Sequence, residues 1–422
     1  MLLDDCGLLH HPVSMRRTLI IVALVVVFLG IAAAVYFLYF AGNSSLSVAP
    51  TQTTTLPNSG NTESTGSSTL SSGNSATTSA PASTQVSSRL IEIDKGPVVA
   101  GEVAFDVGST TPAGSTTPAT APDVEINYLE RPSGNVFSYL LGAATLTRIS
   151  NRTIPGIQEA MWAQSGATAY VRYLSGSDNR TINTYALPST GTGGFFLPQN
   201  VSGLSVSSTS LLLLASGTNG SIATGEKLDG SGAAQLFTTP LSMAAAQWSG
   251  KSALVYTKPS ALLAGYAFLV DKAGNFSHVE GPLNGLVALA SPRGTYAIIS
   301  YTSGGLLKME LVNLKTLSVI ALPVATIADK CAWTYDESAV YCGIPVSASA
   351  SYAYPDDWYQ GTISFTDRIW KIDVVGRYAQ LVLDFSATAN QPLDAVNMTV
   401  DPHSAVLVFR NKRDSSLWAY QL

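Results

Sequence analysis

The densest group of side chains that could contact a ligand lies in residues 345–365, PVSASASYAYPDDWYQGTISF. Within eight positions this stretch holds four aromatic and two acidic residues: Tyr352, Tyr354, Asp356, Asp357, Trp358 and Tyr359. Aromatic rings with adjacent carboxylates could stack on a sugar ring, hold a basic peptide, or bind a cation through oxygen ligands. The alternative interpretation is that the loop folds on itself, with its Tyr and Trp side chains forming a small core of its own.

Two of the three cysteines, Cys331 and Cys342, lie just before this stretch in KCAWTYDESAVYCGIP. A turn at Asp336-Glu337 would place them opposite each other on two strands, with Cβ atoms about 4.5 to 5.5 Å apart, close to what a disulfide requires. Two buried free thiols are the alternative, because cysteine packs as a small hydrophobe. No histidine or third cysteine lies nearby to complete a metal site.

Other side chains typical of catalysis are scarce. Residues 89–422 contain two isolated histidines, His278 and His403, and His403 is interpreted as part of a turn that begins at Asp401. The sequence has no G-x-S-x-G nucleophile elbow, no G-x-x-x-x-G-K-[ST] phosphate loop, no H-E-x-x-H motif and no EF-hand loop. We therefore expect no catalytic residue, metal or cofactor. A net charge of -5 without a basic cluster argues against nucleic acid.

Residues 18–40, TLIIVALVVVFLGIAAAVYFLYF, contain no charge and would form a helix of roughly 35 Å, enough to cross a membrane. Arg16 and Arg17 precede this run and the next charged residue is Glu63, so residues 1–17 should be cytoplasmic. A cleaved signal peptide is the alternative, but its apolar core is usually about 7 to 15 residues long. We expect an uncleaved, single-pass signal anchor in the cell membrane. The rest of the chain would then lie outside, where conditions favour the disulfide.

Residues 41–88 are about half Ser and Thr with one charge, and such a segment cannot bury enough apolar surface to fold. We predict a disordered linker, which in some hosts would be O-glycosylated. Sugars could also be attached at seven N-x-[ST] sequons, including Asn151 and Asn397. In a chain so rich in Ser and Thr, many such triplets arise by chance.

From residue 89 onward, short apolar runs alternate with Gly, Pro, Asn, Asp and Ser, which is typical of an all-β domain. Hairpins repeat along this part, as in EAMWAQSGATAYVRYL (159–174), AAAQWSGKSALVYT (244–257), LVALASPRGTYAIISYT (286–302), KCAWTYDESAVYCGI (330–344) and VNMTVDPHSAVLVFRN (396–411). Each hairpin is followed by a third and a fourth strand. A four-stranded repeat of roughly 45 residues indicates a β-propeller.

The turns of these hairpins carry a W-S-x-x-G-x-x-A pattern, as in Trp248-Ser249-Gly250 and in residues 290–294, ASPRG. This pattern resembles the repeats of TolB-like and Trp-Asp-repeat propellers, and the resemblance covers nearly all of residues 89–422. It implies the fold and says little about the activity.

Counting units predicts seven blades. Their first strands should start near Val98, Ile157, Leu204, Leu241, Leu286, Asp329 and Ala395. The last unit ends one strand short at Leu422, and residues 89–101 resemble the junction between two blades at 146–157. We therefore expect Leu90 to Ile93 to complete blade seven, which would leave no exposed sheet edge at the joint. Trp162, Trp248 and Trp333 recur at equivalent strand ends, which predicts packing between blades.

The domain organisation is thus a cytoplasmic N-terminus (1–17), a transmembrane helix (18–40), a linker (41–88) and a seven-bladed propeller (89–422). We expect a membrane-tethered, extracytoplasmic module that binds or scaffolds an unknown protein or glycan partner. The alternative is a propeller hydrolase or glycan-cleaving enzyme with acidic residues at the channel mouth. Catalysis of that kind needs converging carboxylates or histidines, and Asp356 with Asp357 is the one conspicuous acidic cluster. The sequence therefore favours binding over catalysis.

Overall fold

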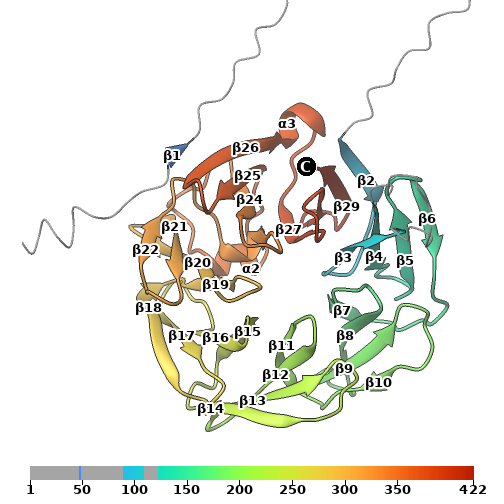
Figure 1. The fold of residues 1–422 in the computed structure, drawn as a ribbon, viewed down its shortest axis with the longest axis horizontal. Helices are drawn as coiled ribbons and strands as arrows, with labels where there is room; N and C mark the ends of the chain where they lie inside the picture. Colours follow the sequence, from blue (N-terminus) through green and yellow to red (C-terminus); the bar gives the residue numbers. More distant parts are fainter. Residues whose placement is uncertain (1–46, 49–88, 109–121) are drawn as a thin grey trace, which may run out of the picture.

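A ring of seven antiparallel sheets makes up the protein in the computed structural model, which describes residues 47–48, 89–108 and 122–422. Figure 1 shows the sheets following one another around the ring in chain order. Each sheet has four strands, and one has a short fifth strand at its edge. The predicted all-β, seven-bladed propeller is therefore confirmed. The predicted membrane span at 18–40 lies outside the described residues, and within those residues no helix is long and apolar enough to cross a membrane.

In each blade the first-named strand lies innermost and the last-named strand lies at the outer edge. Blades 1 to 4 consist of β3 (Val103–Val107), β4 (Asp123–Leu129), β5 (Val136–Leu140) and β6 (Thr145–Arg148); β7 (Ile157–Trp162), β8 (Thr168–Ser175), β9 (Thr181–Pro188) and β10 (Phe195–Phe196); β11 (Val201–Val206), β12 (Ser210–Gly217), β13 (Gly220–Lys227) and β14 (Ala234–Thr239); and β15 (Ala244–Ser249), β16 (Ser252–Thr257), β17 (Ala264–Val270) and β18 (Phe276–Asn284). Blades 5 to 7 consist of β19 (Val287–Ala290), β20 (Tyr296–Ser303), β21 (Leu306–Asn313) and β22 (Val319–Ala321); β23 (Cys331–Trp333), β24 (Ala339–Pro345), β25 (Asp367–Asp373) and β26 (Tyr378–Asp384); and β27 (Ala395–Val400), β28 (Val406–Asn411), β29 (Leu417–Gln421) and β2 (Leu90–Asp94). Among the described residues, three short helical turns lie between strands: η1 (Ala328–Lys330), α2 (Asp356–Tyr359) and α3 (Phe385–Thr388).

The direction of the strands divides the connections between two faces. Since neighbouring strands in a blade are antiparallel, the links between blades and the loops between second and third strands leave the same face, which we call the top face. The turns between first and second and between third and fourth strands lie on the bottom face. The residues of the top face are therefore far apart in sequence but close to one another in space.

Most of the predicted first strands begin within three residues of their observed starts. The start at Val98 is wrong, because the first strand of blade 1 begins at Val103. Val98 and Val99 are buried in the link before it, where their amides donate to Ser415 and Leu129 in two different blades. Because the two amides bond to different blades, the segment does not form a continuous β-ladder with either blade.

The ring closes between the two ends of the domain, as predicted. β2 pairs antiparallel with β29, and Leu90 lies opposite Tyr420. Arg89 adds a hydrogen bond from its Nε to the carbonyl of Gln421 at 2.8 Å. Gly96, with φ of +76°, then turns the chain so close to blade 7 that a Cβ there would lie 2.4 Å from the carbonyl oxygen of Ser415. The last blade is thus built from both ends of the propeller sequence.

A short strand outside the propeller sequence adds to blade 6. β1 (Ser47–Val48) pairs in parallel with Tyr378 and Ala379 of β26, at the outer edge of the ring (Figure 1). The outermost strand of a blade presents unpaired amide and carbonyl groups, which explains why an additional segment can pair there. These two residues belong to the segment that the sequence analysis assigned to the linker.

The hydrophobic core lies between neighbouring blades, and the three recurring tryptophans contribute to it. Trp162 of blade 2 packs among residues of blade 1 and donates its indole N–H to the carbonyl of Gly101 at 3.2 Å. Trp333 of blade 6 stacks on Tyr296 of blade 5 with ring centroids 6.3 Å apart. Trp248 packs against a core cluster that includes residues of blade 3. The predicted packing role of the tryptophans is confirmed.

The two cysteines of blade 6 lie directly opposite each other on β23 and β24. Their sulfur atoms are 2.09 Å apart and form a disulfide. The intervening turn includes Glu337 in the left-handed conformation, with φ of +63°. Glu337 also accepts a hydrogen bond from the amide of Arg293 at 2.6 Å, which joins the bottom faces of blades 5 and 6.

Candidate functional site

The loop between β24 and β25 contains the six predicted binding residues and has a small core of its own. Tyr354 and Trp358 are 1% and 4% exposed. Their ring centroids lie 5.8 and 6.3 Å from that of buried Phe365. Tyr352 and Tyr359 remain 40% and 42% exposed. The loop therefore follows the alternative interpretation for Tyr354 and Trp358, and only Tyr352 and Tyr359 among the four aromatic residues are broadly accessible.

The two carboxylates of the loop bond to backbone amides. Asp356 accepts a hydrogen bond from the amide of Ala261, in the top-face loop of blade 4, at 2.5 Å. Asp357 accepts one from the amide of Ala353 at 2.7 Å, which closes the turn before α2. The predicted residues thus have different environments within the loop, and ligand binding by its exposed members stays a prediction.

A fully buried group of charges, the ion triad Lys330, Asp367 and Asp394, holds this loop to the blades. The Lys330 ammonium lies 2.7 Å from Asp367 and also bonds to Asp394, and none of the three side chains is exposed. Asp394 accepts hydrogen bonds from the indole N–H of Trp358 at 3.1 Å and the amide of Phe365 at 2.8 Å. The ion triad therefore joins three segments: the link into blade 6, the link into blade 7 and the β24–β25 loop.

The ion triad has two carboxylates for one ammonium group. Burial raises the pKa of Asp367 to about 6; the charge of Lys330 opposes this rise and the charge of Asp394 adds to it. One carboxylate oxygen of Asp367 has no hydrogen-bond partner. Proton uptake by Asp367 would leave one carboxylate for the one ammonium group, so we expect the stability of the ion triad to depend on pH.

A solvent-accessible pair, Asp329 and Tyr359, lies beside the ion triad on the top face. The hydroxyl of Tyr359 donates to Asp329 at 2.5 Å. Solvent reaches Asp329, but the surrounding protein displaces part of its hydration and raises the pKa of this carboxyl. Partial loss of hydration to the surrounding protein, the charge of Asp329 and the nearby phenol of Tyr256 together raise the pKa of Tyr359 well above its usual value. The sequence analysis identified Tyr359 and missed Asp329 and Tyr256, because the three come from separate segments without a shared motif.

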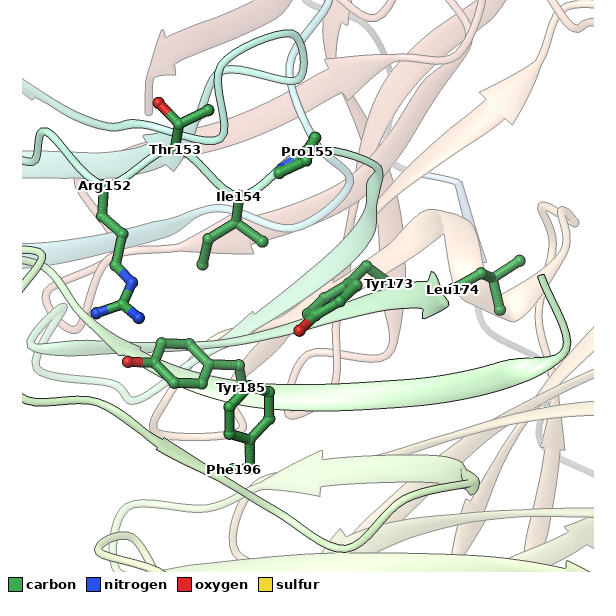
Figure 2. Close-up of a pocket in the computed structure, with 8 residues that line it drawn as sticks. All are labelled: Arg152, Thr153, Ile154, Pro155, Tyr173, Leu174, Tyr185 and Phe196. Carbon is green, nitrogen blue, oxygen red and sulfur yellow. The ribbon is translucent and has the colours of Figure 1, made fainter. Parts of the chain in front are cut away.

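A cavity of about 360 Å³ opens between blade 2 and the link that leads to it from blade 1 (Figure 2). Residues 152–155, in the link from β6 to β7, form one wall, and Tyr173, Leu174, Tyr185 and Phe196 of blade 2 form the other. Tyr185 and Phe196 are cross-strand partners whose ring centroids lie 4.9 Å apart. Phe196 is 63% exposed, so its ring is available to a ligand. We call this cavity the blade 1–2 pocket.

Arg152 provides the positive charge of the blade 1–2 pocket. Its guanidinium lies 5.0 Å from the ring centroid of Tyr185. Figure 2 shows it beside the hydroxyl end of that ring, with the hydroxyl of Tyr173 directed toward the same space. Within the described part of the chain, Arg152 has no acidic partner and both tyrosine hydroxyls lack a hydrogen bond. A cation, two hydroxyls and an exposed ring therefore surround one cavity, the combination that orients small ligands.

One set of three potential metal ligands is present among the described residues: Asp106, Asp401 and His403, whose ligand atoms lie within 4.8 Å of one another. The Nδ1 atom of His403 lies 2.7 Å from a carboxylate oxygen of Asp106. The oxygens of Asp401 accept hydrogen bonds from the amides of His403, Ala405 and Val406. These bonds build the β27–β28 turn, in agreement with the predicted turn at Asp401.

No protein-family model and no curated protein matches the sequence. Solved structures with a similar fold include an oligogalacturonate lyase from Vibrio parahaemolyticus, which is 10% identical over 79% of this chain and 93% of that chain, with a TM-score of 0.53. They also include TolB from Acinetobacter baumannii, at 15% identity over 66% of this chain and 62% of that chain, with a TM-score of 0.40. The β-propeller domain of the Trilobed protease from Pyrococcus furiosus is 9% identical over 75% of this chain and 93% of that chain, with a TM-score of 0.45. The similarity to the lyase, at 10% identity, shows the fold alone.

Proposed function

We propose that this chain is a membrane-tethered, extracytoplasmic β-propeller that binds a glycan at the blade 1–2 pocket. The apolar run at residues 18–40 supports the tether, and the arginines before it support export of the propeller. The observation that carries the binding function is the position of Arg152 over Tyr185, without an acidic partner among the described residues, at the edge of an open cavity.

The chemistry of the pocket suits a sugar residue. The exposed ring of Phe196 can cover the apolar face of a pyranose, while Arg152 and the hydroxyls of Tyr173 and Tyr185 can hydrogen-bond its hydroxyl or carboxylate groups. Typical small-molecule sites occupy roughly 300 to 1,000 Å³, so a cavity of about 360 Å³ is large enough for one or two sugar residues. A peptide that carries an aromatic and an acidic side chain is the competing ligand.

Removing either Arg152 or Phe196 should weaken ligand binding without affecting the fold, because both side chains are exposed. We expect Arg152→Ala and Phe196→Ala each to lower affinity roughly tenfold, about 1.4 kcal/mol. The measurement is a screen of neutral and acidic oligosaccharides and of short peptides on an array, followed by calorimetry with the best ligand. Arg152→Ala should affect acidic ligands more than neutral ones.

Leu262→Ala is the matched control, because Leu262 is 85% exposed in a top-face loop of blade 4, away from the pocket. This variant should bind like the original protein. A ligand that binds all three variants with unchanged affinity would show that the binding surface lies elsewhere on the propeller. Binding of peptides and not of sugars would change the ligand class while keeping the site.

The Asp329–Tyr359 pair favours a second candidate function, a propeller hydrolase or glycan-cleaving enzyme. A solvent-accessible carboxyl with a raised pKa can protonate a leaving oxygen, and the carboxylate of Asp356 lies near enough to influence the pKa of Tyr359. If the protein cleaves any oligosaccharide of the array, Asp329→Asn should slow that cleavage at least about 100-fold. Chromatography of the products tests this, and an unchanged rate would exclude Asp329 as the acid.

A further inference from the structure

The sequons that lie in the described residues share one structural property. Their six asparagines are all exposed: Asn151, Asn179, Asn200, Asn219, Asn275 and Asn397. The buried asparagines of the same part of the chain carry no sequon: Asn127, Asn135, Asn183 and Asn411. All six asparagines are therefore accessible to a transferase.

Attachment of a sugar requires the side-chain nitrogen Nδ2 of asparagine. Asn151, Asn179 and Asn219 make no side-chain hydrogen bond within the described residues. Asn200 uses only its oxygen, which accepts from the amide of Ile182 at 3.1 Å. Asn275 differs, because its Nδ2 donates to Asp271 at 2.9 Å. Of these five asparagines, four combine exposure with a free nitrogen and Asn275 does not.

These four asparagines also lie on the same side of the ring. Asn151 and Asn200 are in the links into blades 2 and 3, and Asn179 and Asn219 are in the second-to-third-strand loops of those blades, so all are on the top face. Asn275 is in the turn between β17 and β18 on the bottom face.

The sixth sequon asparagine, Asn397, has a different position. It lies on the inner strand β27, where Arg410 bonds to its oxygen and a transferase would have to reach the centre of the ring. Exposure alone therefore does not make it equivalent to the four asparagines of blades 2 and 3.

We propose that Asn151, Asn179, Asn200 and Asn219 carry N-linked oligosaccharides that cover the top face of blades 2 and 3. The inference rests on the extracytoplasmic position proposed above. The co-reactant is an oligosaccharide linked to a lipid phosphate. Nδ2 forms a bond with the anomeric carbon, the bond from that carbon to the phosphate oxygen breaks, and the lipid phosphate leaves with the electron pair. Nδ2 loses one proton to a base of the host transferase.

Glycans at these positions would control access to the blade 1–2 pocket. Asn151 directly precedes Arg152, and Asn179 follows β8, which contributes Tyr173 and Leu174 to the pocket wall. N-linked glycans are bulky and hydrophilic, so they would exclude large partners from blades 2 and 3. Small ligands would still enter the pocket, and protein partners would be directed to blades 4 to 7.

The test is mass spectrometry of the full-length protein purified from the membranes of its native host. Glycopeptides from residues 89–422 should carry an oligosaccharide at each of the four asparagines. Each Asn→Gln variant at these positions should lose the mass of one oligosaccharide. Asn275→Gln should change the mass only by the difference between the two residues.

A matched pair of variants separates the sequon from the asparagine. Thr153→Ser keeps the sequon of Asn151 and should keep its glycan, whereas Thr153→Val should lose it. Protease treatment of intact cells is done in parallel to test export. An accessible propeller with four unmodified asparagines would overturn the glycosylation and leave the tether intact. A protected, unmodified propeller would overturn both, and a glycan on Asn275 with none on Asn151 would refute the argument from the free nitrogen.

Discussion

We expect the Lys330→Met variant to lose about 3 to 5 kcal/mol of unfolding free energy at pH 8, because it leaves Asp367 and Asp394 buried without a cation. Methionine has a similar length, so the effect would come from the charge and not from a cavity. The loss should be smaller at pH 5, where the carboxyls of the variant can protonate. Denaturant unfolding of the full chain in detergent, followed by tryptophan fluorescence, measures both values.

The matched variant is Asp367→Asn, which leaves one ammonium and one carboxylate in the ion triad. The folded-state pKa of Asp367 is about 6, above its ordinary value of 3.8. A raised pKa contributes stability that is present below about pH 4 and is lost as the pH rises through 6. Asp367→Asn should therefore match the original protein below about pH 4 and exceed it at pH 8, by about 3 kcal/mol.

Other carboxyl groups with a raised pKa should not affect the comparison between Asp367→Asn and the original protein. Burial raises the pKa of Glu102 to about 8 and that of Glu310 to about 7, and we expect these values to be the same in both proteins because neither group belongs to the ion triad. Equal stability of Lys330→Met and the original protein at pH 8 would mean that the ion triad does not hold the loop to the blades.

Deleting residues 89–101 should prevent formation of a stable propeller. The deletion removes β2 and its pairing with β29, and it also removes Val98 and Val99, both 1% exposed in the core. Blade 7 would then present the unpaired edge of β29 to solvent, which promotes aggregation. We expect the deleted protein to aggregate or to be digested by protease under conditions in which the intact propeller survives.

A deletion of equal length in the predicted linker, residues 72–84, provides the control. It shortens the chain before the propeller by the same amount and leaves every strand of the ring in place. Size-exclusion chromatography and limited proteolysis of the two deletions should give opposite results. A monomeric, protease-resistant product from the 89–101 deletion would show that six complete blades and an open seventh suffice.

Much of the fold could be predicted because it repeats. Hairpins of similar length, with small or turn-forming residues at each reversal, give the number of blades, and a missing last strand indicates where the ring must close. The Cys331–Cys342 pairing follows from the same register, since both residues flank one turn. Only the link at Val98 was misassigned, because its amides alternate between two blades instead of following one strand.

The candidate sites were harder to predict because they combine residues from distant segments. Arg152, Tyr173 and Phe196 come together only when the link from β6 crosses blade 2. Asp356 and Asp357 form the most conspicuous acidic cluster in the sequence, yet both bond to backbone amides. Conversely, Lys330 and Asp394 are ordinary charged residues in sequence and lie fully buried in the structure. Clustering in sequence does not distinguish a ligand-binding side chain from one that fixes a loop.

The positions of β1 and β2 determine how the ring would respond to a mechanical pull from its N-terminal side. Tension on the chain before Ser47 acts first on the two-residue pairing of β1 with β26, which has few hydrogen bonds to resist it. The 40 residues between β1 and β2 have a contour length of about 140 Å. After β1 is released, the next described strand along the chain is β2, which closes the ring. The edge of blade 6 would thus yield before the propeller opens.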